Sequence, residues 1–138
     1  MPRYGDGAAA FGGATYDVTS HYRAASVFAF HLQQGLTPDR LRAISRHQVG
    51  LLKTEVERLD MSPSLATVVP MPDERRGGFL AIRIPNAKDV ARRLRQRSVH
   101  VDARGDVLRL GPAPYLHDDQ LRAAVEALGD VMAGRASA

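Results

Sequence analysis

The sequence contains no cysteine and has no long run of apolar residues. A chain without cysteine forms no disulfide and offers no thiolate to a metal, which is typical of proteins from a reducing compartment such as the cytoplasm. A helix that spans a membrane needs about 18 or more consecutive apolar residues, so we expect no membrane span. Residues 1–6 also lack the apolar stretch of a secretory signal. Together these absences predict a cytoplasmic protein.

Lysine is scarce as well: Lys53 and Lys88 are the only two, and the other basic residues are arginine. The formal net charge of +4 invites a nucleic-acid interpretation. However, the densest basic run, Arg92–Arg97, falls on a predicted helix and contains no aromatic residue on which a base can stack. We interpret this run as a solvated helix face and expect no nucleic-acid binding.

The five histidines are scattered, and no two of them lie four residues apart beside a carboxylate. Metal sites on helices use that spacing, so we expect no metal site. Ser20 and His21 are adjacent, but nothing around them predicts the strained turn that exposes a nucleophilic serine. We therefore expect no serine-hydrolase triad.

What the chain does contain is enough apolar sequence for one core, since 44% of its 138 residues are hydrophobic. We expect an irregular N-terminal segment over residues 1–18 and a single domain over residues 19–138. Two helices are predicted at the start of this domain. The first is capped by Thr19 or Ser20 and ends before Gly35, and the second begins at Thr37.

The second helix runs to about residue 60, because apolar residues recur at helical spacing from Leu41 to Leu59. We expect the two helices to form an antiparallel hairpin. Beyond them, the pattern of β-branched residues and turn formers predicts four strands, at 66–69, 78–84, 99–101 and 107–110. Two further helices are expected, from Asn86 to about Gln96 and from His117 onward. The predicted fold class is α+β, a small sheet of about four strands with helices packed on one side, preceded by a helical hairpin.

The segment from Arg109 to Tyr115 combines an arginine at the end of a predicted strand with a glycine and two prolines. A guanidinium offers a planar fork of donors that matches a carboxylate, and the prolines fix the backbone behind it. This pattern suits binding the carboxylate of a small amino-acid substrate. The alternative is a surface arginine paired with Asp102 or Asp106 across the preceding turn.

Together with the segments Arg76–Phe79 and Ser98–Arg104, this motif resembles the C-terminal small domain of pyridoxal-phosphate enzymes. The similarity is greatest to the kynureninase-like branch of the class V aminotransferases. The resemblance implies that Arg109 binds the α-carboxylate of the substrate. It also implies hydrolase or transferase chemistry in the complete enzyme. For kynureninase itself, that chemistry is hydrolytic Cβ–Cγ cleavage of an aryl side chain.

A second implied site lies near the N-terminus. The segment Gly12–Ser20 resembles a loop of this family in which a threonine hydroxyl reaches the cofactor phosphate of the neighbouring subunit, and Thr15 is the matching residue. Ala14 stands where relatives often have glycine, and the alternative is a plain loop before a helix cap. If Thr15 has this role, the chain belongs to a homo-oligomer, a dimer in the simplest case.

Pyridoxal phosphate also needs a lysine for its internal aldimine. The family places that lysine in a large domain upstream of everything seen here, and neither Lys53 nor Lys88 matches it. The resemblance covers only about the final third of a complete enzyme, so Met1 is an artificial or internal start, or the edge of a split or decayed gene. We therefore expect no catalysis and no bound cofactor in this chain alone, and a large pyridoxal-phosphate-binding domain as its partner.

Two other functions stay open. The chain is a stand-alone docking or dimerisation module, in which case apolar residues such as Val27, Phe28 and Phe30 are exposed. Alternatively, it is a basic nucleic-acid binder, which predicts retention on DNA that is lost with salt. The turn at Arg75–Gly78 either binds an anion through backbone donors or begins a hairpin.

Overall fold

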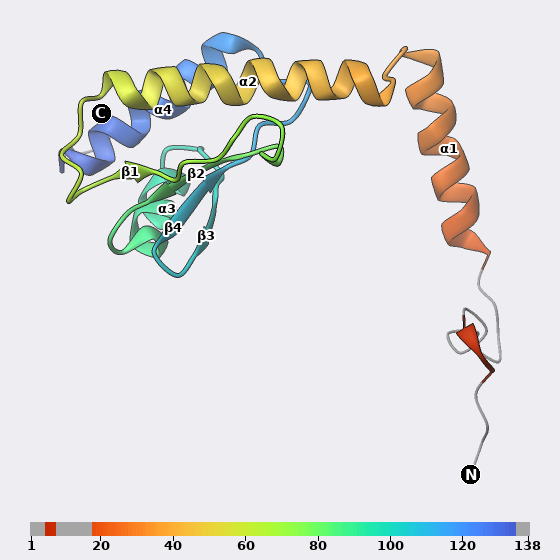
Figure 1. The fold of residues 1–138 in the computed structure, drawn as a ribbon, viewed down its shortest axis with the longest axis horizontal. Coiled ribbons are helices and arrows are strands. Elements are labelled where there is room, and N and C mark those ends of the chain that lie inside the picture. The colour runs from red at the N-terminus through yellow and green to blue at the C-terminus, as the bar shows by residue number, and fades with distance from the viewer. Residues whose placement is uncertain (1–4, 8–17, 135–138) are drawn as a thin grey trace. The chain divides into compact units, whose positions relative to one another are not determined.

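The computed structural model describes residues 5–7 and 18–134. The chain divides after Thr37 into two units. The first unit holds helix α1 (Thr19–Gln33), and the second holds the other elements. These are α2 (Pro38–Arg58), β1 (Thr67–Val68), β2 (Leu80–Arg83), α3 (Ala87–Arg95), β3 (Asp102–Arg104), β4 (Val107–Leu110) and α4 (Asp118–Met132) (Figure 1). Within these residues, no helix combines the length and the apolar character that a bilayer crossing requires.

Helix α1 begins one residue earlier than predicted. The backbone is already helical at Val18, which occupies the N-cap position, so Thr19 and Ser20 lie inside the first turn and the predicted cap is wrong. The predicted end is confirmed, because Gly35 has a φ of +61° and follows the C-cap. None of the residues of this helix is buried.

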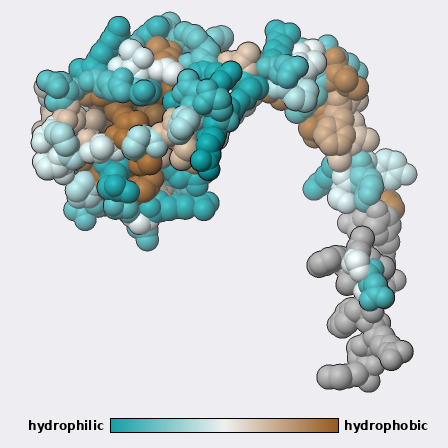
Figure 2. Space-filling view, viewed as in Figure 1, coloured by the Kyte–Doolittle hydropathy of each residue, from teal (hydrophilic) through white to brown (hydrophobic). Residues whose placement is uncertain are grey.

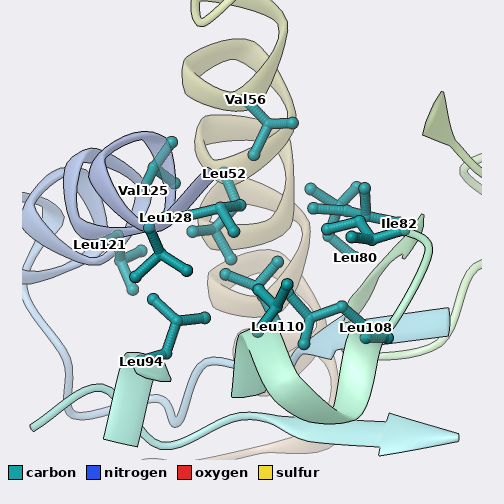
Figure 3. Close-up of a cluster of buried hydrophobic side chains, with 14 of the residues drawn as sticks. Leu52, Val56, Leu80, Ile82, Leu94, Leu108, Leu110, Leu121, Val125 and Leu128 are labelled. Carbon is teal, nitrogen blue, oxygen red and sulfur yellow. The ribbon is translucent and has the colours of Figure 1, made fainter. Parts of the chain in front are cut away.

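The four strands form one antiparallel sheet in the order β1-β2-β4-β3. Side chains alternate between the two faces of a strand. One face of the two central strands is fully apolar and buried, and the three helices of this unit pack on it (Figure 3). Its residues are Leu80, Ile82, Leu108 and Leu110.

The core joins this apolar face to the buried sides of three helices. Leu52 comes from α2, Leu94 from α3 and Leu128 from α4, and each is at most 2% exposed (Figure 3). The α+β class is confirmed, as are a four-stranded sheet with helices on one side and two helices that precede it.

The third strand is displaced from its predicted position. Residues 99–101 were expected to form it, but the strand is Asp102–Arg104. Val99 instead donates its backbone N–H to the carbonyl of Leu94, 3.0 Å away, and so completes the end of α3. The predicted connection of residues 102–106 contracts to the two-residue turn Gly105-Asp106, because Gly105 adopts a φ of +60°. The shift places Asp102 directly across from Arg109.

The two remaining helices begin near the predicted residues. Asn86 is the N-cap of α3, but it has a φ of +59° and its side chain makes no capping hydrogen bond. His117 is the N-cap of α4, where the side-chain oxygen of Gln120 accepts a hydrogen bond from the His117 backbone N–H at 2.9 Å.

Candidate functional site

Arg109 lies on the face of the sheet that the helices leave uncovered. Its neighbours Leu108 and Leu110 point into the core, so strand alternation turns Arg109 outward. Ala81 stands across from it on β2 and carries no side chain beyond Cβ. The Arg109 side chain is 27% exposed. The sheet thus presents a half-buried guanidinium on its outer face.

Asp102 is the ionic partner of this guanidinium. Arg109 Nη1 donates to Asp102 Oδ2 at 3.1 Å, and Arg104 Nε donates to the same oxygen at 3.2 Å. The ion pair that the sequence offered as an alternative therefore exists. It rests on one hydrogen bond to a shared carboxylate that is 53% exposed, not on a bidentate contact. Pairs this exposed contribute about 0–1 kcal/mol to stability.

The ring of Phe79 supports the guanidinium from another side, with its centroid 4.1 Å from Arg109 Cζ. Phe79 precedes β2 and lies two residues before Ala81, so alternation along the chain places it on the outer face as well. The Nε–H of Arg109 is buried and has no hydrogen-bond acceptor among the described residues. An unsatisfied buried donor costs about 1–3 kcal/mol, so the domain by itself leaves this side chain incompletely satisfied.

Gln48 fixes the loop that follows Arg109. It lies on α2, is 3% exposed, and donates from Nε2 to the carbonyls of Ala113 at 2.9 Å and Leu116 at 3.1 Å. Gln48 is not among the site residues predicted from the sequence. Its signal was a polar residue four positions after Ile44 and four before Leu52, inside an otherwise apolar stripe.

The imidazole of His47, next to Gln48 on α2, anchors the start of α4. His47 Nε2 lies 2.9 Å from Asp118 Oδ1. Through the adjacent residues His47 and Gln48, α2 therefore contacts both the start of α4 and the loop that leads to it.

A cavity of about 200 Å³ lies next to Phe79, beneath the segment between β1 and β2. Phe79, Ala81, Lys53 and Arg76 contribute to its lining. Arg42 of α2 holds the covering segment by donating to the carbonyls of residues 73 and 76 at 2.9 and 3.0 Å. The side chain of Arg42 therefore ties the segment between β1 and β2, which contributes Arg76 to the lining, to α2.

The remaining predictions from the sequence concern Thr15, the two lysines and a metal site. Thr15 lies outside the described residues. Lys53 is 47% exposed with its Nζ 3.8 Å from Glu57, and Lys88 is exposed in the first turn of α3. In residues 5–7 and 18–134, no three metal-ligating side chains gather in one place.

The basic run on α3 is partly neutralised by carboxylates. Arg92 pairs with Asp89, and Arg97 Nη1 lies 3.2 Å from Asp130. Arg92 lies on an exposed face of α3, as predicted for this run. Arg97 follows the helix, is only 14% exposed and pairs with a residue of α4, so it is not part of that solvated face.

Comparison with known proteins gives two findings. The family model for the kynureninase C-terminal domain matches residues 41–128, which include Gln48, Phe79, Asp102 and Arg109. A solved structure, an adenosylmethionine-8-amino-7-oxononanoate aminotransferase from Methanocaldococcus jannaschii, has a similar fold, with a TM-score of 0.67 and 14% sequence identity.

That structural similarity covers 92% of this chain and 30% of the aminotransferase chain. The chain therefore spans about 30% of the length of the solved structure that it resembles. A search of curated protein sequences returned no match.

Proposed function

We propose a function from one premise: the chain belongs to the kynureninase C-terminal domain family. It is the small-domain portion of a pyridoxal-phosphate enzyme that acts on an amino-acid substrate, and Arg109 contributes the contact to the substrate carboxylate. The rest of the enzyme is a large domain that holds the cofactor, supplied upstream or by a separate chain. The chemistry is that of a kynureninase-like hydrolase or of an aminotransferase.

The observation that carries the proposal is the state of Arg109. Its guanidinium is held against Phe79, bonded to Asp102 through Nη1 alone, and left with a buried Nε–H that no described residue satisfies. An arginine that served only as a surface ion-pair partner gains nothing from this arrangement. A guanidinium kept in place for an external carboxylate benefits from it, because a fixed fork loses little freedom when it binds.

The residues of this chain do not fit the anchoring of the cofactor. An internal aldimine needs a lysine in a defined, shielded position. Lys53 is half-exposed and lies near Glu57, and Lys88 is exposed. We therefore derive no step through pyridoxal phosphate from this chain, and we assign the aldimine lysine to the large domain. Thr15 stays proposed as a contact to the cofactor phosphate of a neighbouring subunit.

Titration with sodium acetate tests the carboxylate role without the large domain. We expect the backbone N–H resonance of residue 109 to shift as acetate replaces chloride at constant ionic strength. The variant Arg109→Lys keeps the charge but loses the planar fork, so we expect acetate binding to weaken about tenfold, the loss of one charge-assisted hydrogen bond.

Arg104→Lys is the matched control, because Arg104 bonds the same Asp102 oxygen and is 76% exposed. We expect it to change acetate affinity less than twofold. Equal effects of the two substitutions would mean that acetate senses only the general charge of the sheet face, and the proposed role of Arg109 would then be wrong.

A second function, a docking or dimerisation module, has its own support in α1. Apolar and aromatic side chains of this helix are exposed, and hydrophobic surface covers part of it in Figure 2. The largest exposed fractions belong to Leu32 at 81%, Tyr22 at 72% and Phe28 at 64%. Such a surface is typical of a helix that packs against another protein surface. This function is compatible with the first, since a separate large domain is one such partner.

A further inference from the structure

We infer that Phe79 is a positioning residue for Arg109, and that Gly77 is glycine because the Phe79 ring occupies its side-chain space. The inference rests on the proposed carboxylate role of Arg109. It gives a function to the Arg76-Gly77-Gly78-Phe79 segment, which the proposed function does not use.

The Phe79 ring and the Arg109 guanidinium are in stacking contact. The guanidinium carbon lies 4.1 Å from the ring centroid, which is van der Waals stacking distance. The ring limits rotation of the guanidinium on one side, and Asp102 holds Nη1 on another. Two contacts, one from the residue before β2 and one from β3, therefore fix the orientation of one planar group.

The Phe79 ring leaves little space for a side chain at Gly77. A Cβ atom added at Gly77 would lie 3.0 Å from Phe79 Cε1, tighter than most Cβ contacts, so the ring would have to shift. A Cβ at Gly111, the residue after β4, would lie 3.7 Å from Phe79 Cβ, which is an ordinary contact distance. Glycine at position 77 therefore leaves the ring free to lie under Arg109.

The segment that carries the Phe79 ring is held in place by Arg42 and by its own ion pair. Arg42 donates to the carbonyls of Asp73 and Arg76, and Arg76 pairs with Asp73. The Arg76 side chain is only 12% exposed, so the turn before Gly77 is held by contacts on both sides. A platform residue needs such a fixed backbone, because a mobile ring does not restrict the group above it.

The test uses three variants of the full chain and the acetate titration. Phe79→Leu removes the aromatic face, and Phe79→Tyr keeps it. Gly77→Ala leaves the ring intact but displaces it. We expect Phe79→Leu and Gly77→Ala each to weaken acetate binding about threefold to tenfold, because the guanidinium must then be immobilised by the ligand. We expect Phe79→Tyr to bind acetate within twofold of the parent chain.

The side-chain Nε–H resonance of Arg109 gives an independent readout. The ring above it shifts this resonance, so Phe79→Leu moves it toward the position of a free arginine and Phe79→Tyr does not. Tyr115→Leu is the control for loss of an aromatic residue, since Tyr115 is 79% exposed. Thermal unfolding of each variant reports whether the fold is kept, and where Phe79→Leu fails to fold, Gly77→Ala and Phe79→Tyr decide the question.

Two results overturn the inference, and they are distinguishable. If the parent chain binds acetate at Arg109 and Phe79→Leu or Gly77→Ala binds it equally well, the positioning role is wrong and the carboxylate role stands. If acetate causes no shift at Arg109 in the parent chain, the carboxylate role is wrong and the positioning role falls with it.

Discussion

At the scale of single residues, the proposed role of Arg109 makes Asp102 and a substrate carboxylate competitors for the same guanidinium. Asp102 Oδ2 already accepts hydrogen bonds from both Arg104 and Arg109, so its charge is shared. An exposed, shared carboxylate is held weakly. Under the proposed function, Asp102 is therefore a replaceable partner that neutralises Arg109 until a carboxylate binds.

The variant Asp102→Asn tests this competition. Removing the charge raises the positive potential at Arg109, so we expect acetate to bind about threefold to fivefold more tightly, since a unit charge about 4 Å away in water is worth about 1 kcal/mol. Asp106→Asn is the control, because it makes the same change at the turn of the hairpin, where Asp106 pairs with Arg83. Acetate affinity that falls in Asp102→Asn would instead mean that Asp102 holds Arg109 in its binding orientation.

The sequence predicted part of this site for a local reason. Arg109 and its proline-containing exit are contiguous, and contiguous residues can be read without a fold. The contacts of Arg109 are not contiguous: Phe79 and Asp102 reach it only through the register of β2, β4 and β3. Strand register depends on turn geometry and on which face is buried, so spacing left Asp102 and Asp106 as alternative partners of Arg109 and gave no sign of Phe79.

At the scale of elements, the β3–β4 hairpin decides which side chain faces Arg109. Sequence analysis predicted a longer connection over residues 102–106, since its aspartates and glycine are all turn formers. The positive φ of Gly105 allows a two-residue turn, and the residues before it then join the sheet. A one-residue change in this turn would move Asp102 to the other face of the strand.

Two glycine substitutions of opposite sign test the role of this turn. Gly105→Ala forces a side chain into a positive φ, so we expect it to lower the free energy of unfolding by about 1–2 kcal/mol. Gly50→Ala is the matched control in the middle of α2, where an added Cβ meets nothing within 4 Å, and we expect it to raise the free energy of unfolding by about 0.5–1 kcal/mol. Urea unfolding of both variants measures the difference, and a neutral Gly105→Ala would show that the turn tolerates a different geometry.

At the scale of the whole molecule, the order of helices and strands was predictable because each element has a strong local pattern. The apolar stripe of α2, the buried strand β2 and the capped start of α4 all appear where the sequence placed them. The sequence marks Gln48 only as a polar residue inside the apolar stripe of α2, because the two backbone carbonyls that accept its hydrogen bonds are presented only by the folded loop.

The exposed apolar side chains of α1 predict self-association of the chain. Helices of about 12–15 residues are marginally stable in water, and most gain their stability by burying an apolar face. Helix α1 has 15 residues, none of them buried, and among its exposed side chains are Phe28 and Phe30. We expect the chain without a large domain to self-associate through this helix, so that the average mass in sedimentation equilibrium rises with concentration.

The double substitution Phe28→Ser and Phe30→Ser should hold the chain at the mass of a monomer over the same concentrations, because it removes about 2–3 kcal/mol of apolar burial per ring from the contact. Tyr115→Ser is the control, since it removes an aromatic residue that is even more exposed, at 79%, but belongs to the other unit. We expect it to associate like the parent chain. Should Tyr115→Ser abolish association and the double variant keep it, the contact lies on the sheet-bearing unit, and α1 is not the surface through which this chain meets a partner.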